Sequence, residues 1–140
     1  MKIMGIDLGD STTGISVCDE NQILASPLCI IEEKNKKKLC VKIHSLCIEN
    51  SIKLIVLGNP INMNGTFGKR SMMAKEFQNQ LFQTTKIEII LQDERLSTVF
   101  AKRCFLSANV SSKKYKKRID SASACLILQN YLDSIKSSKI

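Results

Sequence analysis

The sequence predicts an α/β domain in which a mixed sheet carries helices on both faces, and three observations lead to this fold class. Two short apolar runs joined by a polar turn open the chain, as in a β-hairpin. A continuous apolar run follows at Leu54–Leu57 and a mostly apolar run at Ile87–Leu91, as expected of strands buried inside a sheet. Segments with helical spacing separate these runs, and such alternation is typical of helices packed on both faces of a sheet.

The first half of the chain supplies three expected strands and one helix. The opening hairpin joins Lys2–Asp7 to Gly14–Cys18 through a turn of glycine, aspartate, serine and threonine. Residues 22–31 supply a third strand, which Pro27 shortens or places at an edge because proline cannot donate to a ladder. A helix is indicated by apolar residues at every fourth position: Leu39, Ile43 and Cys47.

The second half alternates the two buried strands with helices. The loop at 62–70 contains Asn64, Gly65 and Gly68. Helical spacing then marks two segments, one with Met73, Phe77 and Leu81 and one with Leu96, Phe100 and Cys104. Residues 108–118 are polar and basic without an apolar period, and 119–132 form the last expected helix, with Asp120 at its start.

Length and charge bound the possible functions. The 140 residues fit one domain, 1–140, and the net charge of +8 with a pI near 9.3 favours an anionic partner such as nucleic acid. Alternatively, the charge reflects only a lysine-rich surface. No signal peptide or membrane-spanning run is evident, so a cytoplasmic location is expected.

The six cysteines do not form a C-x-x-C pair, so the sequence gives no support for a structural zinc site. Several of them fall in apolar helical patterns. Reduced, buried thiols are therefore expected.

Four acidic residues stand where open sheets place their sites, at strand ends and a helix start: Asp7, Asp93, Glu94 and Asp120. Converging carboxylates repel one another, and Mg²⁺ removes this penalty because it prefers hard oxygen ligands. Each residue alone also fits a turn, ion-pair or capping role. Asp93 and Glu94 point to opposite faces if the strand persists, which leaves open which of them joins a cluster.

Four segments, spread over nearly the whole chain, carry a resemblance to a known family: Gly5–Gly9 through Gly14, Gly58–Gly65, Asp93–Val99, and Ile119–Ala124 continuing through Leu126–Gln129. In these segments the chain resembles the YqgF (RuvX) family of RNase H-like proteins, the pre-16S rRNA nucleases. It implies an RNase H-like fold related to Holliday junction resolvases, and a nuclease that matures the 5′ end of pre-16S rRNA.

The resemblance also implies a site. Asp7, Glu94 and Asp120 match the acidic positions of the family, with Asp93 beside them, so they are expected to bind Mg²⁺ or Mn²⁺ and to act in catalysis. The sequence departs from the family at four positions. Ser11 and Thr12 replace a usual Lys-Arg pair, Asn59 replaces leucine and Phe100 replaces glutamate. None of these departures removes an expected metal ligand.

Basic residues near these segments are candidates for binding nucleic acid. Lys69 and Arg70 stand at an expected helix start, and Arg95 follows the acidic pair. A basic run surrounds one aromatic side chain that could stack on a base: Lys113, Lys114, Tyr115, Lys116, Lys117 and Arg118. A solvated charge run or a plain turn is the simpler alternative for each.

Three functions compete at this point. The first is phosphodiester hydrolysis by metal-activated water, on pre-16S rRNA or on a branched DNA junction. The second is ATP binding, because Asp7, Gly9 and Gly14 also resemble the first phosphate loop of actin-like and sugar-kinase ATPases. The third is a ribosome-assembly factor that binds pre-rRNA without cleaving it, to which the missing Lys-Arg pair gives some weight.

Overall fold

The computed structural model describes residues 1–59, 68–93 and 112–137, and within them the side chains of 1–59, 68–69, 71–92 and 122–135. A five-stranded sheet lies at the centre, with strand order β3-β2-β1-β4-β5. Its strands are β1 (Lys2–Asp7), β2 (Thr12–Cys18), β3 (Ala25–Glu32), β4 (Ile52–Asn59) and β5 (Glu88–Asp93). β1 pairs antiparallel with β2 and parallel with β4, so the sheet is mixed, as the sequence predicts.

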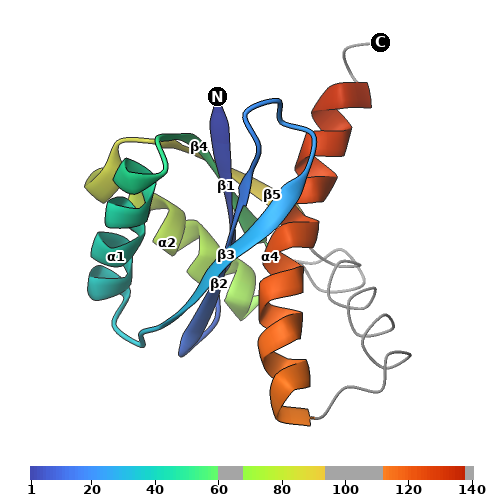
Figure 1. Cartoon of the computed structure of the whole chain (residues 1–140). Helices are drawn as coiled ribbons and strands as arrows, with labels where there is room; N and C mark the ends of the chain where they lie inside the picture. Colours follow the sequence, from blue (N-terminus) through green and yellow to red (C-terminus); the bar gives the residue numbers. More distant parts are fainter. Residues whose placement is uncertain (60–67, 94–111, 138–140) are drawn as a thin grey trace.

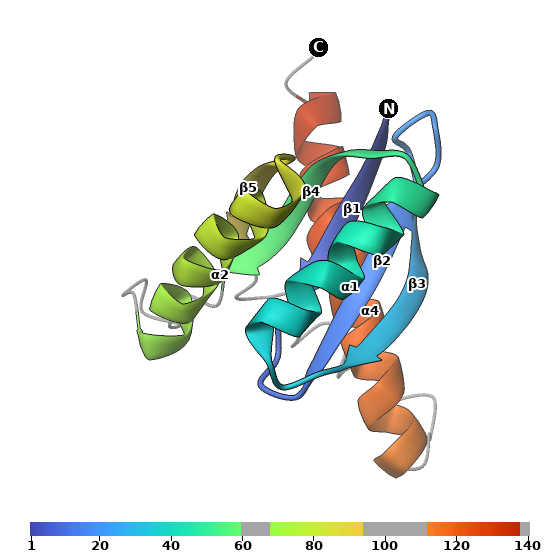
Figure 2. The same ribbon diagram turned by 90° about the vertical axis from the view of Figure 1, so that its left-hand side faces the viewer.

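Within the described ranges, three helices cover the two faces of this sheet (Figures 1 and 2). They are α1 (Lys36–Glu49), α2 (Lys69–Thr85) and α4 (Ser112–Ser137). Figure 1 shows α1 and α2 on one side of the strands and α4 on the other. The expected α/β architecture, with helices on both faces of a mixed sheet, is confirmed.

Alternation along β1 divides the core into two layers. Met4 and Ile6 are fully buried on the side of α1 and α2, where they pack with Ile43, Phe77 and Leu81. Ile3 is buried on the opposite side, in the cluster that includes Ile127, Leu128 and Leu132 of α4. The strand is therefore covered on both faces, which explains its continuous apolar sequence.

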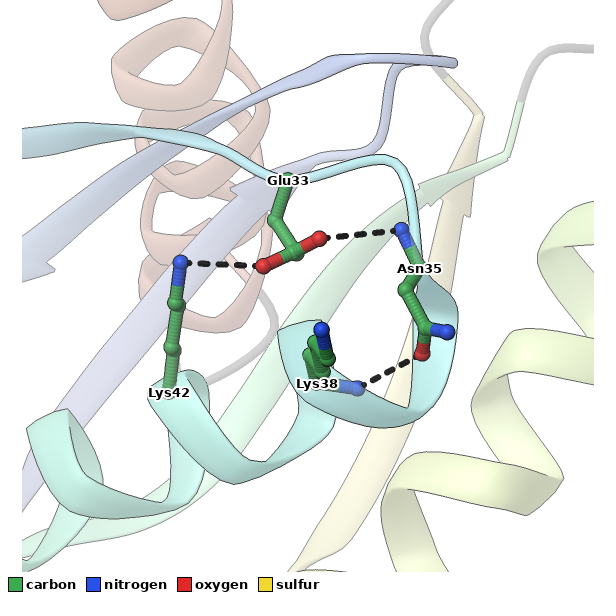
Figure 3. Close-up of polar contacts among 4 residues, drawn as sticks. All are labelled: Glu33, Asn35, Lys38 and Lys42. Atoms are coloured by element: carbon green, nitrogen blue, oxygen red, sulfur yellow. Dashed lines mark hydrogen bonds and ion pairs between the residues drawn. The ribbon is translucent and has the colours of Figure 1, made fainter.

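The start of α1 shows why this helix begins where it does. The Asn35 side chain accepts a hydrogen bond from the backbone N–H of Lys38 at 3.0 Å and so caps the helix (Figure 3). Glu33 accepts from Asn35 N at 3.2 Å and pairs with Lys42 at 3.1 Å. These two bonds also lower the pKa of the Glu33 carboxyl. The helix then buries Leu39, Ile43 and Cys47, the three residues that predicted it.

Two sequence predictions need correction at the last helix. α4 begins at Ser112, so Asp120 does not open it but lies in its third turn. The basic run at 113–118, which the sequence pattern left outside the expected helix of 119–132, is likewise helical. Lys and Arg are good helix formers, so the lack of an apolar period did not prevent the helix from extending through them.

Pro27 stands in β3, at the edge of the sheet, as predicted. The helix expected around Phe100 lies outside the described residues.

Candidate active site

Asp7 is the last residue of β1 and lies half-buried at the carboxyl edge of the parallel strands. Alternation places it on the same face as Ile3 and Gly5, which both contact α4. Its backbone pairs with Gly14 of β2, at the start of the opening hairpin. Asp7 therefore occupies the edge where sites form in open sheets, on the side that α4 covers.

The carboxyl ends of β4 and β5 meet at the same edge. Asn59 and Asp93 are the last residues of their strands and are partners in the ladder. In β5, Ile90 packs with the α4 cluster and Leu91 with the α1–α2 cluster. Asp93 follows Leu91 by two residues and closes β5 at this edge. Glu94 lies outside the described residues.

The direction of α4 relative to β1 follows from two contacts. Ala124 and Leu128 lie over Gly5, near the carboxyl end of β1. Gln129 lies nearer the opposite end, since it accepts from Ala25 N at 2.9 Å and Ala25 pairs with Cys18. The helix thus runs antiparallel to β1. Asp120 precedes Ala124 by one turn, so its backbone lies toward the end of the sheet that carries Asp7.

The donor set suits a hard cation such as Mg²⁺, because every expected ligand is a carboxylate. Among the described side chains, no three His, Cys, Asp or Glu residues come together as a metal site. Asp7 is the one expected ligand whose side chain belongs to that set. The backbone nevertheless brings Asp7 and the α4 turn with Asp120 toward one edge.

The predicted nucleic-acid residues divide into three groups. Lys69 is exposed at the first residue of α2, and Arg70 follows it in the helix. This end of α2 is held at the carboxyl edge, because Ser71 Oγ donates to the buried Asn59 Oδ1 at 2.7 Å. Residues 113–118, including Tyr115, lie in the first two turns of α4, before Asp120. Arg95 lies outside the described residues.

One cation near the site escaped sequence reasoning. Lys36 of α1 donates from Nζ to Gly9 O at 2.8 Å and lies 3.4 Å from Asp10 O. These carbonyls belong to the hairpin that directly follows Asp7, so Lys36 anchors that hairpin to α1. In the sequence Lys36 belongs to a charged run, and nothing in the pattern distinguishes it from its neighbours.

Within the part of the chain that the structure describes, the thiols and the histidine do not supply a nucleophile or base at this edge. Burial raises the pKa of Cys47 to about 11, and it also raises the pKa of Cys29, Cys40 and Cys125, so these residues remain neutral thiols near pH 7. His44 lines a cavity of about 460 Å³ beside Ile52 and Glu88, the first residues of β4 and β5. That cavity is at the amino ends of these strands, away from Asp7.

Comparison with known proteins gives consistent matches over nearly the whole chain. Residues 1–134 match the family model described as RuvX, Holliday junction resolvase. A protein from Thermoanaerobacter pseudethanolicus is 41% identical over 98% of this chain and 99% of its own length. One from Clostridium novyi is 40% identical over 96% of this chain and 100% of its own. Both carry the name pre-16S rRNA nuclease.

Solved structures with low sequence identity share the fold. A fowlpox virus resolvase, solved with Holliday junction DNA, is 13% identical with a TM-score of 0.62, covering 96% of this chain and 99% of its own. RuvC from T. thermophilus, also with a Holliday junction substrate, is 13% identical with a TM-score of 0.54, covering 99% and 97%. At such identities the likeness concerns the fold alone, and it confirms the RNase H-like architecture expected from the sequence. In the described part of the chain, no helix is long and apolar enough to cross a membrane.

Proposed function

The chain belongs to the RuvX family and is a nuclease, and we propose that it hydrolyses phosphodiester bonds with divalent metal ions held by Asp7, Glu94 and Asp120. One observation carries this proposal above the others. The antiparallel packing of α4 on β1 puts the turn that contains Asp120 at the end of the sheet where Asp7 stands. Asp7 and the α4 turn that contains Asp120 are far apart in sequence, and their backbones lie toward the same edge of the sheet, which supports a shared site.

The third ligand is better assigned to Glu94 than to Asp93. β5 ends at Asp93, and Glu94 follows it in the sequence. Glu94 stands at the acidic position of the family in the resemblance found from the sequence. We therefore assign Glu94 as the third ligand, with Asp93 beside it as an additional carboxylate.

Mg²⁺ or Mn²⁺ is the cofactor that these oxygen donors fit. When bound, such an ion supplies an activated water and neutralises charge on the scissile phosphate. The protein would hold the metals through its carboxylates and hold the nucleic acid through basic side chains near the same edge. The candidates are Lys69, Arg70, Arg95 and the α4 run Lys113, Lys114, Tyr115, Lys116, Lys117 and Arg118.

Pre-16S rRNA is the substrate that we assign, because close relatives matching nearly their full lengths carry that name. The activity would then belong to ribosome biogenesis, and the cytoplasmic location expected from the sequence stays a prediction. A branched DNA junction is the second candidate, since the matching family model is described as a Holliday junction resolvase. The net charge of +8 favours either polyanion.

Cleavage of labelled substrates by the purified protein tests this function. In Mg²⁺ the wild-type protein is expected to cleave the 5′ end of a pre-16S rRNA fragment. Addition of EDTA should abolish this cleavage. Asp7→Asn should reduce the cleavage rate by about 100-fold or more. Even mutation of residues that only hydrogen-bond to metal ligands often lowers metal affinity or activity by 10–100-fold. Asp10→Asn is the matched control, because Asp10 is exposed in the adjacent hairpin. This variant should cleave the RNA at the wild-type rate.

Each alternative predicts a different result in the same assay. Cleavage of a four-way DNA junction without cleavage of the RNA would assign the resolvase activity. RNA binding without Mg²⁺-dependent cleavage, unchanged in Asp7→Asn, would identify a non-cleaving assembly factor and contradict the proposed nuclease site.

A further inference from the structure

We propose that Ser16 is a positioning residue for the metal site, acting through α4 on the placement of the turn that contains Asp120. The inference rests on the proposed function, since it concerns how two of the proposed ligands are held in relation to each other. Ser16 lies in β2 and is fully buried, yet its side chain is polar. It touches neither metal nor substrate in this assignment.

The contact joins the sheet to α4 directly. Ser16 Oγ donates to the backbone carbonyl of Ala124 at 2.8 Å and lies 3.4 Å from the carbonyl of Gly5. All three residues are buried. A hydrogen bond has a preferred length and angle, so this bond fixes the position of α4 along the strand more narrowly than apolar packing would.

The backbone of β1 makes the same contact tighter. A Cβ atom at Gly5 would lie 2.7 Å from Leu128 Cβ and 2.9 Å from Ala124 O, and it would also strike Ser16 Oγ. Only a residue without a side chain lets α4 approach this closely. We call Gly5, Ser16 and Ala124 the α4 seat.

The α4 seat is close to both proposed ligands along the chain. Gly5 precedes Asp7 by two residues, or about 7 Å along a strand. Ala124 follows Asp120 by four residues, or about 6 Å along a helix. Any shift of α4 at the seat therefore displaces the Asp120 turn relative to Asp7 by a similar amount. Displacements of about 1 Å can cost about 100-fold in catalysis.

A second polar link between α4 and the sheet provides a matched comparison. Gln129 accepts from Ala25 N at 2.9 Å and donates to Ile23 O at 2.9 Å. It stands about 13 Å from Asp120 along the helix axis. Removing this link should loosen the distant half of α4 and leave the Asp120 turn in place.

Ser16→Ala is a mild change for the fold. The smaller side chain fits the same space, and Ala124 O remains free to accept its bond within α4. Gln129→Met removes the distant link with little change in volume. Comparison of the two variants therefore separates a general weakening of α4 packing from a specific effect on the metal site.

The experiment is a Mn²⁺ titration by electron paramagnetic resonance, together with steady-state cleavage of the pre-16S rRNA fragment in Mg²⁺. Ser16→Ala is expected to weaken Mn²⁺ binding about tenfold and to lower kcat about tenfold. The KM for RNA should stay within about twofold, because the RNA contacts are unchanged. Gln129→Met should keep both metal affinity and kcat within about twofold. Cysteine is near-isosteric with serine and a weaker donor, so Ser16→Cys should have a Mn²⁺ affinity and a kcat between those of Ser16→Ala and the wild type. If Ser16→Ala does not fold, Ser16→Cys provides the test.

The outcomes separate this proposal from the proposed function. If Asp7→Asn loses Mn²⁺ while Ser16→Ala binds it as tightly as the wild type, the role of Ser16 is overturned and the metal site stands. An equal loss in Gln129→Met would also overturn it, because the effect would then be general. If the wild type does not bind Mn²⁺, or Asp7→Asn binds it unchanged, both proposals fail.

Discussion

The two faces of the sheet hold their helices by different means. α1 and α2 rest mainly on bulky apolar side chains, among them Met4, Ile6 and Ile15 of the sheet. α4 also buries apolar side chains, but at its closest approach it meets Gly5 and Ser16 and is joined by a hydrogen bond to its backbone. Apolar attraction is non-directional, whereas a backbone contact with a hydrogen bond has one geometry. The α1–α2 face also has hydrogen bonds, from Ser71 Oγ to Asn59 Oδ1 and from Gln78 Nε2 to Ile89 O. These bonds join helix side chains to strands, whereas the bond from Ser16 reaches the backbone of α4 at a point where Gly5 presents no side chain.

This difference predicts that stability and metal binding respond to different faces. A change on the α1–α2 face should lower the free energy of unfolding without moving the carboxylates. A change at the α4 seat should do both. The two classes of variant can be compared by urea unfolding and by Mn²⁺ affinity measured on the same preparations.

The largest loss of stability is expected from Leu81→Ala on the α1–α2 face. Leu81 is fully buried, and its truncation leaves a cavity that should cost about 2–5 kcal/mol of unfolding free energy. At temperatures where the variant remains folded, its Mn²⁺ affinity should equal that of the wild type. A metal affinity reduced as strongly as in Ser16→Ala would contradict the separation of the two faces.

Gly5→Ala should lower the free energy of unfolding less than Leu81→Ala does, and it should weaken Mn²⁺ binding more. The added methyl group meets Leu128 Cβ and the Ala124 carbonyl, so overpacking should cost about 1–3 kcal/mol. Because α4 must move to make room, Mn²⁺ binding should fall by more than the roughly tenfold expected for Ser16→Ala. Adding Ser16→Gly relieves one of the three collisions, so the double variant should recover part of the stability. Wild-type metal affinity in Gly5→Ala would show that the seat does not place the ligands.

The same contrast explains what the sequence could and could not predict. Apolar periodicity predicted α1 from Leu39, Ile43 and Cys47, and largely apolar runs predicted β4 and β5, because buried faces of helices and strands carry apolar residues at regular positions. The edge position of Asp7 followed from the end of such a run. The bond from Ser16 to Ala124 joins residues 108 apart, and a single serine in a strand carries no information about its partner.

Lys36 and the start of α4 were missed for related reasons. The bond of Lys36 to the hairpin is tertiary, and its sequence neighbours are lysines with the same local character. The first turns of α4 extend through a basic run whose intrinsic helix propensity is high but whose pattern lacks an apolar stripe. Local patterns therefore predicted Asp7 at the end of a strand but were wrong about Asp120 at a helix start, while the contacts that orient α4 on the sheet depend on the assembled fold.

The smallest effect is expected from a thiol on the α1–α2 face and appears only in alkali. Burial raises the pKa of Cys47 from 9.0 to about 11, so the folded protein retains a proton that the unfolded chain releases above pH 9. The folded state then binds more protons than the unfolded state, and the free energy of unfolding must fall as pH rises from about 9 to 11. Urea midpoints between pH 8 and 11 should decline less steeply in Cys47→Ala than in the wild type. Identical slopes would show that this thiol is not desolvated and that the α1–α2 face is packed more loosely around α1 than its buried residues indicate.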